Sequence, residues 1–387
     1  MNKHLTLKKG KEASPLRKHR WIFSGAVATV SEELTDGDLI DVLDFKRNKI
    51  ATGFFNDGSI AVKIMAFGNT EINEAYFIER FKTALAIREK AGLVNNANTN
   101  AYRLFHAESD GIPGIIIDNY NGHIVFQVHH IYILNNLDMI MSSFKKVFPE
   151  TKSIYLKFTQ KFKSDIDPFI EGKVEETIVK ENGISFHVNW TKGQKTGFFL
   201  DQRDNRSLLG KYSAGKRVLN TFCYTGGFSM YALTHGATAV SSVDSSAYAI
   251  EGLEKNLEVN KLQDKNHTSI QQDALEYLTK TEDVFDLIIL DPPAFAKSIS
   301  SRHNAIMAYK RINALALKKI ETNGILFTYS CSQVVDKFSF TSAVLAAAIE
   351  TGREVSILHQ MSQPADHPIN IFHPETEYLK GLVLFVK

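Results

Sequence analysis

The stretch that decides the fold is residues 217–243, RVLNTFCYTGGFSMYALTHGATAVSSV. Residues 218–222 are short and rich in apolar side chains, which predicts a buried parallel strand. Gly226 and Gly227 break that run, an apolar helical face follows, and Gly236 is placed to stop the helix. Residues 239–243 then form a second strand, so the order is strand, glycine turn, helix, strand.

This order predicts a ligand site at the carboxyl edge of a parallel sheet. Glycines let the backbone approach a ligand, and the helix that follows presents free N–H groups. Asp244, at the end of the second strand, is placed to accept hydrogen bonds from a ribose diol. The dinucleotide pattern G-x-G-x-x-G is absent, so the turn, flanked by Phe222 and Tyr224, suits a nucleoside such as S-adenosylmethionine. The alternative is an ordinary βαβ unit whose glycines serve only the turn.

From residue 215 onward the chain alternates regularly between strands and helices. The pattern predicts seven strands, at 217–223, 239–244, 267–272, 285–290, 324–330, 354–360 and 379–386. The last two are joined by an irregular connection containing proline, so we expect them to pair antiparallel. Five helix-linked strands followed by such a hairpin form an α/β sheet of the Rossmann-like, class I methyltransferase type.

Length and composition limit the alternatives. The chain has 387 residues, more than one ordinary core contains, and a net charge of only +2. No apolar run could span a membrane, and the basic N-terminus is not a signal peptide. Two cysteines, Cys223 and Cys331, fit a reducing cytoplasm and cannot form a cysteine zinc site alone, so we expect no metal.

The sequence predicts three domains, at residues 1–70, 71–190 and 191–387. The first is β-rich, with strands at 39–44, 50–55 and 59–66 after a short helix or turn at 14–25. The second is α+β, with helices at 74–91 and 134–148, a hairpin at 115–128 and a strand at 153–158.

Two basic clusters are candidates for contacts with nucleic-acid phosphates. Residues 1–20 hold seven Lys or Arg and one Glu, and Arg17, Lys18 and Arg20 are the residues we assign to RNA. The second cluster comprises Lys152, Lys157, Lys161 and Lys163. A solvated surface without a partner is the alternative in both cases.

Three acidic residues follow successive predicted strands, and such positions face one crevice in a doubly wound sheet. Asp244 would hold the ribose, Asp273 would reach the adenine amino group, and Asp291 would face the methyl acceptor. For Asp273 the alternative is a helix N-cap.

Residues 291–295, DPPAF, form a stiff loop because two prolines remove two backbone donors. Asp291 can bond the edge of a base, and Phe295 could stack on its face. The alternative is a rigid loop with a core phenylalanine.

Cys331 follows the fifth strand, in LFTYSCS, across the crevice from Asp291. Pyrimidine carbon 5 is a poor nucleophile until a group adds at carbon 6, and a thiolate is the usual agent. A small buried hydrophobe is the alternative for Cys331, and it is the interpretation that we favour for Cys223.

Residues 195–206, KTGFFLDQRDNR, precede the first strand of the sheet. Phe198 and Phe199 could cover a nucleoside, with Lys195 and Asp201 beside the cofactor. Arg203 offers a cationic contact to the substrate. In the alternative, Asp201 caps a helix on which Arg203 and Arg206 are exposed.

Taken together, these motifs resemble the RlmI family (also called YccW) of bacterial 23S ribosomal RNA cytosine-5 methyltransferases. The resemblance covers essentially the whole chain and includes HRWIFSGAV, YRLFHAESDGIPGIIIDNY, KTGFFLDQRDNR, FCYTGGFS, DPPAF, TYSCS, QPADHP and YLKG. It implies an N-terminal PUA domain, a central α+β domain and a C-terminal methyltransferase domain. It also implies S-adenosylmethionine as donor, 5-methylcytosine in large-subunit ribosomal RNA as product, and a homodimer.

The wider group of RNA 5-methylcytosine enzymes usually carries a second cysteine in the loop after the fourth strand. DPPAF has none, so Cys331 would act alone and the base that removes the carbon-5 proton is unassigned. Two other functions remain open. One is methylation of an exocyclic amine of adenine or guanine through the DPPAF loop, and the other is an RNA-binding assembly factor without turnover.

Overall fold

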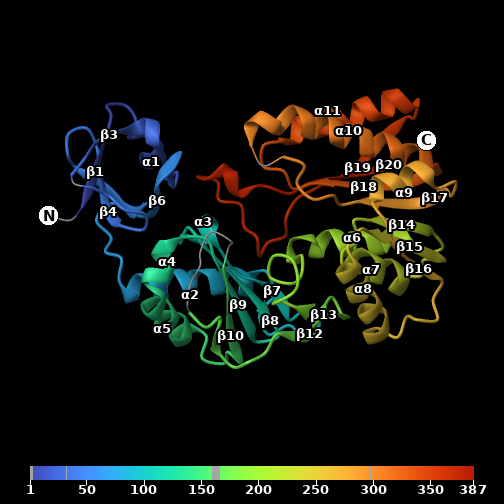
Figure 1. Cartoon of the computed structure of the whole chain (residues 1–387), viewed down its shortest axis with the longest axis horizontal. Coiled ribbons are helices and arrows are strands. Elements are labelled where there is room, and N and C mark those ends of the chain that lie inside the picture. The colour runs from blue at the N-terminus through green and yellow to red at the C-terminus, as the bar shows by residue number, and fades with distance from the viewer. Residues whose placement is uncertain (1–2, 32, 159–165, 297) are drawn as a thin grey trace. The chain divides into compact units, whose positions relative to one another are not determined.

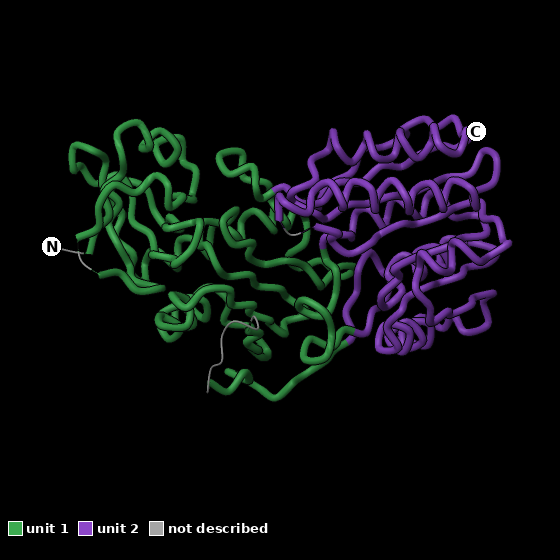
Figure 2. The backbone as a smooth tube through the Cα atoms, turned by 45° about the horizontal axis from the view of Figure 1, so that its top comes forward, with its two compact units in different colours: residues 1–177, 188–200, 365–376 green, residues 178–187, 201–364, 377–387 purple. Residues whose placement is uncertain are grey.

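The computed structural model describes residues 3–31, 33–158, 166–296 and 298–387. The chain divides into two compact units (Figure 2). The first comprises residues 1–177, 188–200 and 365–376, and the second residues 178–187, 201–364 and 377–387. The hairpin of β12 (Glu176–Glu181) and β13 (Ile184–Asn189) contributes to both. The domain boundaries at residues 70 and 190 stay a prediction.

A seven-stranded sheet forms the centre of the second unit (Figure 1). Its order is β16-β15-β14-β17-β18-β20-β19, and its strands are β14 (Arg217–Thr221), β15 (Ala239–Asp244), β16 (His267–Gln271), β17 (Phe285–Leu290), β18 (Ile320–Ser330), β19 (Val355–Met361) and β20 (Lys380–Val386). All neighbours are parallel except β20, which pairs antiparallel with both β18 and β19. The predicted seven strands and the antiparallel hairpin are confirmed.

Helices cover both faces of this sheet (Figure 1). One face carries α6 (Arg203–Ser213), α7 (Gly227–Thr234) and α8 (Ala247–Val259), and the other α9 (Ala274–Lys280), α10 (Arg302–Lys319) and α11 (Lys337–Thr351). Short 3-10 turns, η2 (Leu200–Gln202) and η3 (Ile299–Ser301), precede α6 and α10. Ile288 and Leu326 on central strands are fully buried against helix residues such as Ile312, because a parallel sheet is covered on both sides.

The first unit begins with a six-stranded sheet in the order β2-β6-β5-β4-β1-β3. Its strands are β1 (His4–Leu7), β2 (Trp21–Phe23), β3 (Val27–Val30), β4 (Leu39–Leu43), β5 (Lys49–Phe55) and β6 (Ile60–Phe67), with the short helices α1 (Ala13–Leu16) and η1 (Ser24–Ala26). The three predicted strands are confirmed. The helix or turn predicted over 14–25 is wrong at residues 21–23, which pair with β6 because Ile22 belongs to the core.

A five-stranded sheet, β11-β10-β9-β8-β7, follows in the same unit. Its elements are α2 (Glu74–Lys90), β7 (Ala101–His106), α3 (Ala107–Asp110), β8 (Ile115–Tyr120), β9 (His123–Val128), α4 (Ile131–Asn135), α5 (Leu137–Val147), β10 (Ser153–Phe158) and β11 (Phe169–Glu171). The predicted hairpin is confirmed. The single helix predicted over 134–148 is wrong at its start, where the chain forms two helices. Asn136 separates them because its backbone is non-helical, and its side-chain amide donates to Tyr132 O at 2.8 Å.

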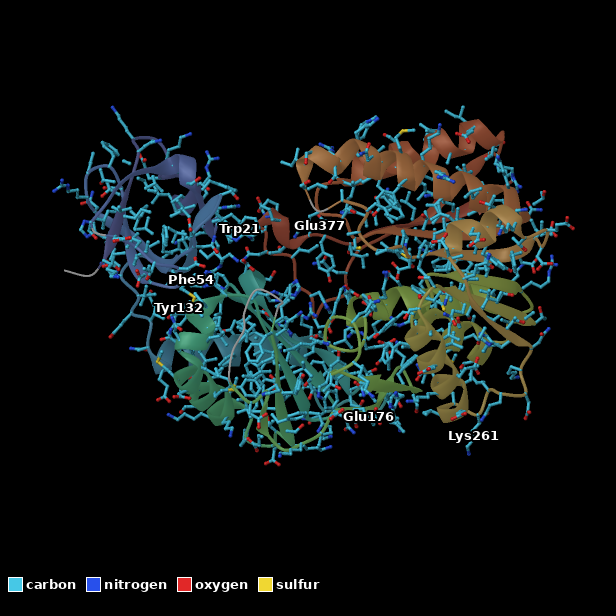
Figure 3. The ribbon with its side chains drawn as sticks, in the orientation of Figure 1. Trp21, Phe54, Tyr132, Glu176, Lys261 and Glu377 are labelled. Carbon is cyan, nitrogen blue, oxygen red and sulfur yellow. The ribbon has the colours of Figure 1, made fainter. Side chains whose placement is uncertain are left out.

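Aromatic stacking and buried charge join the parts of the first unit. The rings of Phe54 on β5 and Tyr132 on α4 stack at 5.0 Å (Figure 3). Arg88 is fully buried and binds the Asp110 carboxylate at 2.8 Å and Asp366 O at 2.7 Å. The Asp366 carboxylate also accepts from Arg103 N at 2.9 Å, so residues 365–376 are anchored to the first unit even though they connect β19 and β20.

Within the described part of the chain, no helix combines the length and the apolar character needed to cross a bilayer.

Candidate active site at the carboxyl edge of the seven-stranded sheet

The turn after β14 is held in an unusual backbone conformation. Phe222, Tyr224 and Gly226 all have positive φ, at 55°, 47° and 77°. A left-handed conformation costs a residue with a side chain about 1–3 kcal/mol, and such residues cluster at ligand-binding sites. Gly226 is the N-cap of α7, and a Cβ there would lie 2.8 Å from Leu253 Cγ. The turn therefore requires glycine at 226 and stores strain at two aromatic residues.

Buried polar side chains that the sequence analysis did not single out fix this turn. Asn256 on α8 donates to Thr225 O at 2.8 Å and accepts from His187 N at 2.7 Å. Beneath the turn, hydrogen bonds join Ser229 to Asn220 and to Ser242. No motif revealed Asn256, because its partners lie far away in the sequence.

Asp244 is positioned by two backbone donors. Its carboxylate oxygens accept from Tyr224 N and Ser246 N, both at 2.9 Å, and the residue is half-buried. Each carboxylate oxygen can accept more than one hydrogen bond, so both can still accept from ribose hydroxyls. The contact of this carboxylate with a ribose stays a prediction.

Asp273 acts as the N-cap of α9. Its Oδ1 accepts from Glu276 N at 2.9 Å, and the residue is exposed. The helix-cap interpretation of Asp273 is therefore confirmed, while a contact with adenine stays a prediction for the same carboxylate.

Asp291 follows β17 and is oriented by a glutamine from the segment before the sheet. Gln202 donates from Nε2 to Asp291 Oδ1 at 2.9 Å, and Asn205 donates to Gln202 Oε1 at 2.6 Å. These two hydrogen bonds orient the Asp291 carboxylate at the edge of the sheet, where its Oδ1 already accepts a hydrogen bond from Gln202. Gln202 lies inside the KTGFFLDQRDNR motif, but the sequence analysis assigned site roles to its charged neighbours and none to Gln202.

The interpretation of α6 as an exposed helix capped by Asp201 is wrong. Arg203 and Arg206 are only 4% and 2% exposed, and the Arg206 guanidinium pairs with the buried Glu181 carboxylate at 2.6 Å. Gln202 is the N-cap residue, and the Asp201 carboxylate instead accepts from Tyr378 OH at 2.8 Å. Arg203 Nε lies 3.3 Å from Asp204 Oδ1.

The DPPAF loop and the TYSCS segment lie next to each other because β17 and β18 are parallel neighbours. Cys331 is half-buried, and its Sγ lies 3.9 Å from Pro292 O. Ser332 Oγ lies 3.0 Å from Tyr309 OH, which helps to fix the segment against α10. Phe295 packs on the ring of Tyr309 at 4.8 Å and remains half-buried, so it is partly a core residue.

A buried lysine lies beside this cysteine and was not identified from the sequence. Lys380 opens β20 opposite Ser330, and its Nζ donates to Ser332 O and Tyr378 O, both at 2.7 Å. Burial lowers the pKa of Lys380 to about 8, and the electrostatic interaction with Cys331 opposes that shift. The sequence did hold one indication of this role, because Lys380 is the only charged residue in the strand KGLVLFV and stands at its first position.

Cys223 differs from Cys331 in its surroundings. It is 5% exposed, and burial raises the pKa of its thiol well above the ordinary range, with the Asp244 carboxylate adding to the effect. A thiol that stays protonated is a poor nucleophile, which agrees with the structural role predicted for Cys223.

Several predicted contact residues belong to the first unit. Lys195 Nζ lies over the Phe199 ring at 4.4 Å. Arg17 and Lys18 are exposed, whereas Arg20 is buried with Nη1 donating to Ile64 O and Met65 O. Arg20 therefore has an internal role that the basic cluster did not reveal.

The second basic cluster is also partly used inside the fold. Lys157 Nζ donates to Trp190 O at 2.6 Å and Gly193 O at 2.7 Å, and burial lowers its pKa to about 8. Lys161 and Lys163 lie outside the described residues.

Comparison with known families gives the class of the protein. The family described as S-adenosylmethionine-dependent methyltransferase matches residues 145–370, more than half of the chain, and a PUA-like domain matches residues 5–67. The chain is therefore an S-adenosylmethionine-dependent methyltransferase with a PUA-like N-terminal domain, and S-adenosylmethionine is its cofactor.

Full-length relatives narrow the class. The chain is 39% identical to a ribosomal RNA large subunit methyltransferase I from Tolumonas auensis and 38% identical to one from Aeromonas hydrophila, each over 99% of both chains. It belongs to the ribosomal RNA large subunit methyltransferase I family. Among solved structures, SMU.776, a methyltransferase complexed with SAH, is 25% identical with a TM-score of 0.87 over both whole chains. A Streptococcus mutans methyltransferase at 24% identity and a TM-score of 0.86 has the same fold.

Proposed function

We propose that this enzyme methylates carbon 5 of a cytosine in large-subunit ribosomal RNA, with Cys331 as the nucleophile. The names of its relatives support large-subunit ribosomal RNA as the substrate. The observation that carries the cytosine proposal is the half-buried Cys331 thiol beside the DPPAF loop, at the end of the strand next to the one that Asp291 follows. An exocyclic amine would need no thiol at this position.

The cofactor would be held by the turn and by the acidic residues of the edge. We assign Asp244 to the ribose and Asp273 to the adenine amino group, with the backbone of Phe222, Tyr224, Gly226 and Gly227 along one side. Lys195, Phe199, Asp201 and Asp291 complete the proposed set. S-adenosylmethionine supplies an electrophilic methyl group when bound.

The protein would prepare the base for methylation by covalent addition. The Cys331 thiolate forms a bond to carbon 6, and the electron pair of the 5,6 double bond moves to carbon 5 and the ring. The ring takes up a proton from solvent at nitrogen 3 as this charge develops, and returns it when Cys331 leaves. Asp291, held by Gln202, stabilises the protonated ring by accepting a hydrogen bond from it. Carbon 5 gains the methyl group and loses its proton, the double bond re-forms, and Cys331 leaves as thiolate.

Lys380 supports this step in the proposal. An ammonium group near a cysteine favours the thiolate over the thiol. Because the pKa of Lys380 is about 8, its side chain carries a proton at neutral pH, so it acts here as a cation and not as the base. The base that removes the carbon-5 proton stays unassigned.

RNA would be positioned by contacts outside the sheet edge. Exposed Arg17 and Lys18 bind phosphates in this proposal, whereas buried Arg20 shapes the surface around them. The target cytosine enters unpaired or flipped out, since carbon 6 is inaccessible inside a duplex. Phe295 contacts the base in this proposal, and Arg203, although only 4% exposed, is kept as the candidate for a cationic contact to the substrate.

Two further features belong to the proposal. A cytoplasmic location is favoured by the two free cysteines, and a homodimer is implied by the resemblance to the family. Three exposed apolar residues on α11, Phe338, Leu345 and Ile349, offer one surface for self-association. Light scattering of the purified protein tests the dimer, and a monomer at all concentrations would reject it.

The experiment that tests the proposed reaction uses labelled S-adenosylmethionine and ribosomal RNA from cells lacking this protein. Wild type and Cys331→Ala are run in parallel, and the RNA is digested to nucleosides for mass analysis. We expect label in 5-methylcytidine with wild type only. Label in a methylated purine, or equal label with both proteins, would favour methylation of an exocyclic amine. No label on free or assembled RNA would favour the assembly factor.

A further inference from the structure

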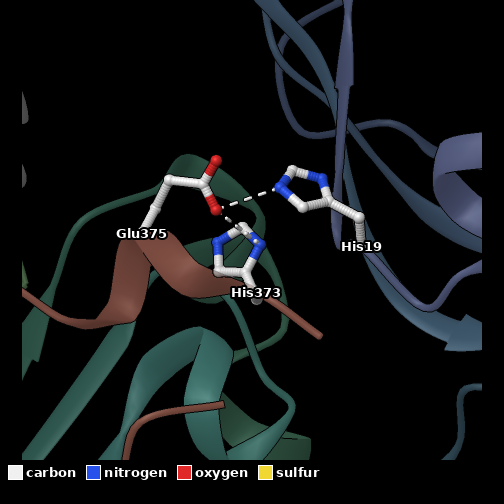
Figure 4. Close-up of side chains that lie close together, drawn as sticks. All are labelled: His19, His373 and Glu375. Carbon is white, nitrogen blue, oxygen red and sulfur yellow. Dashed lines mark hydrogen bonds and ion pairs between the residues drawn. The ribbon is translucent and has the colours of Figure 1, made fainter. Parts of the chain in front are cut away.

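We propose that His19, His373 and Glu375 form a binding site for a divalent transition-metal ion, and that Zn²⁺ suits these donors. All three residues belong to the first unit (Figure 4). His19 lies just before β2, whereas His373 and Glu375 lie at the 3-10 turn η4 (Pro374–Thr376) in the connection between β19 and β20. The proposal does not depend on the methylation reaction.

The distances suit a single ion. Glu375 Oε2 lies 3.0 Å from His19 Nε2 and 3.6 Å from His373 Nδ1, and the three candidate ligand atoms lie within 4.8 Å of one another. Around a tetrahedral zinc ion with bonds of about 2.0–2.2 Å, neighbouring ligand atoms are roughly 3.3 Å apart. Small rotations of the side chains would therefore give the required geometry.

The strongest indication is the state of His373. Its side chain is 1% exposed, and its Nδ1 is buried without a hydrogen-bond partner among the described residues, facing the Glu375 carboxylate. An unsatisfied buried nitrogen destabilises a fold. A histidine binds a metal ion through a ring nitrogen that carries a lone pair, and the buried Nδ1 of His373 is placed to serve as one.

The His19 ring can form two different sets of hydrogen bonds. One set fits an ion pair with Glu375, and the other fits a bound metal ion. Its Nδ1 lies 3.3 Å from Trp21 N and 3.2 Å from Trp21 O. If Nδ1 accepts from Trp21 N, Nε2–H can donate to Glu375, but His373 Nδ1 stays unsatisfied. If Nδ1–H donates to Trp21 O, Nε2 presents a lone pair to the carboxylate, and a cation between them satisfies all three donor atoms at once.

The surroundings permit entry and hold the rings in place. The Trp21 ring packs edge-on against His373 at 4.6 Å, and the two imidazole rings lie 4.5 Å apart. The Glu375 side chain is 38% exposed, so water can complete the coordination. Of the other charges that act on His373, Glu108 favours a cation and Arg20 opposes it. A bound ion would tie residues 365–376 to the N-terminal sheet, in addition to the Asp366 contacts.

The test uses untagged, full-length protein carrying Cys331→Ser, so that the half-buried Cys331 thiol cannot bind zinc. The protein is stripped with a chelator and titrated calorimetrically with Zn²⁺ at pH 7.5, and bound metal is measured after dialysis. We expect one zinc per chain, lost in His373→Gln and in Glu375→Gln and retained in the control His303→Gln, which changes an exposed histidine on α10. Binding should weaken as pH falls through the range in which imidazoles gain protons.

Glu375→Gln is the decisive variant, because it keeps the size of the side chain and a hydrogen-bonding oxygen for His19. Circular dichroism of the metal-free proteins shows whether both variants are folded. Less than stoichiometric zinc in the parent protein, or equal zinc in folded Glu375→Gln, would overturn the proposal and leave a plain His–Glu ion pair.

Discussion

At the scale of single residues, the same side chain can serve the fold and the proposed reaction, and Asp273 shows how to separate the two. Its carboxylate caps α9, as one interpretation of the sequence predicts, and is also our candidate for the adenine amino group. Ser at an N-cap preserves the hydrogen bond to the helix, whereas Ala removes it at a cost of about 1 kcal/mol. The two roles therefore respond differently to these substitutions.

We predict that Asp273→Ser keeps the thermal stability of the wild type but weakens S-adenosylmethionine binding about tenfold, since a hydrogen bond to the ligand is lost. Asp273→Ala should lower both the thermal stability and the affinity for S-adenosylmethionine. Thermal denaturation and calorimetric titration with the cofactor measure the two effects. Unchanged cofactor affinity in Asp273→Ser would leave the residue with the helix cap alone.

Lys380 offers a prediction based on pH. Its pKa is lowered to about 8 by burial, so it carries its charge below that pH and loses the charge as pH rises through it. If the ammonium favours the Cys331 thiolate, Lys380→Met should reduce kcat roughly 10- to 100-fold at pH 7 and recover in part at higher pH. The matched control is Lys337→Met, which removes an exposed lysine on α11 paired with Glu377. A uniform loss at every pH would indicate a structural role only.

At the scale of elements, the sheet of the second unit could be predicted almost completely. β15 and β17 begin and end where the apolar runs predicted, because parallel strands buried on both faces leave a clear pattern. The turn after β14 was also located from its glycines. Its left-handed aromatic residues could not be predicted, because their conformation depends on Asp244 and Asn256, which reach the turn only in the folded protein.

The segment before the sheet was the part of the candidate site that the sequence described least well. Helix α6 looks exposed by charge pattern, yet Arg206 is buried because Glu181, from the distant hairpin β12–β13, neutralises it. Lys380 was missed for a related reason, because only the pairing of β20 with β18 brings it beside Cys331. Contacts between distant segments, and not local propensity, decided both cases.

The glycine turn gives a prediction for this scale. Gly226→Ala should destabilise the protein by roughly 1–3 kcal/mol, because φ is 77° and the new Cβ would meet Leu253 at 2.8 Å. It should also weaken cofactor binding. Gly236→Ala is the control, with φ at 86° and the nearest atom 3.9 Å away, and should cost stability alone. Urea denaturation and cofactor titration distinguish them, and equal cofactor affinity in both variants would contradict a ligand role for the turn.

At the scale of the whole molecule, the chain combines a PUA-like domain with a methyltransferase domain, and the proposed division of labour is RNA binding by one and chemistry by the other. The net charge of +2 requires that RNA binding use a local set of cations. Arg17 and Lys18 are the exposed residues of the N-terminal cluster that we retain for this role.

We predict that Arg17→Ala with Lys18→Ala weakens binding to ribosomal RNA and reduces the slope of log affinity against log salt by about 1.4, since each phosphate contact contributes roughly 0.7 for single strands. The control replaces Lys255 and Lys265, which are exposed in the second unit. Filter binding at several salt concentrations measures the slope. Equal slopes for wild type and the double variant would place the RNA contacts elsewhere.

The central claim is that Cys331 forms a covalent bond to carbon 6 of the target cytosine, and trapping that bond tests it most directly. RNA made with 5-fluorocytidine can be attacked and methylated but has no carbon-5 proton to lose, so the enzyme should remain attached. With S-adenosylmethionine present, we predict a denaturant-resistant complex whose cross-linked peptide contains Cys331, and no complex with Cys331→Ala. Full turnover to 5-methylcytidine by Cys331→Ala, or a cross-link at Cys223, would contradict the account.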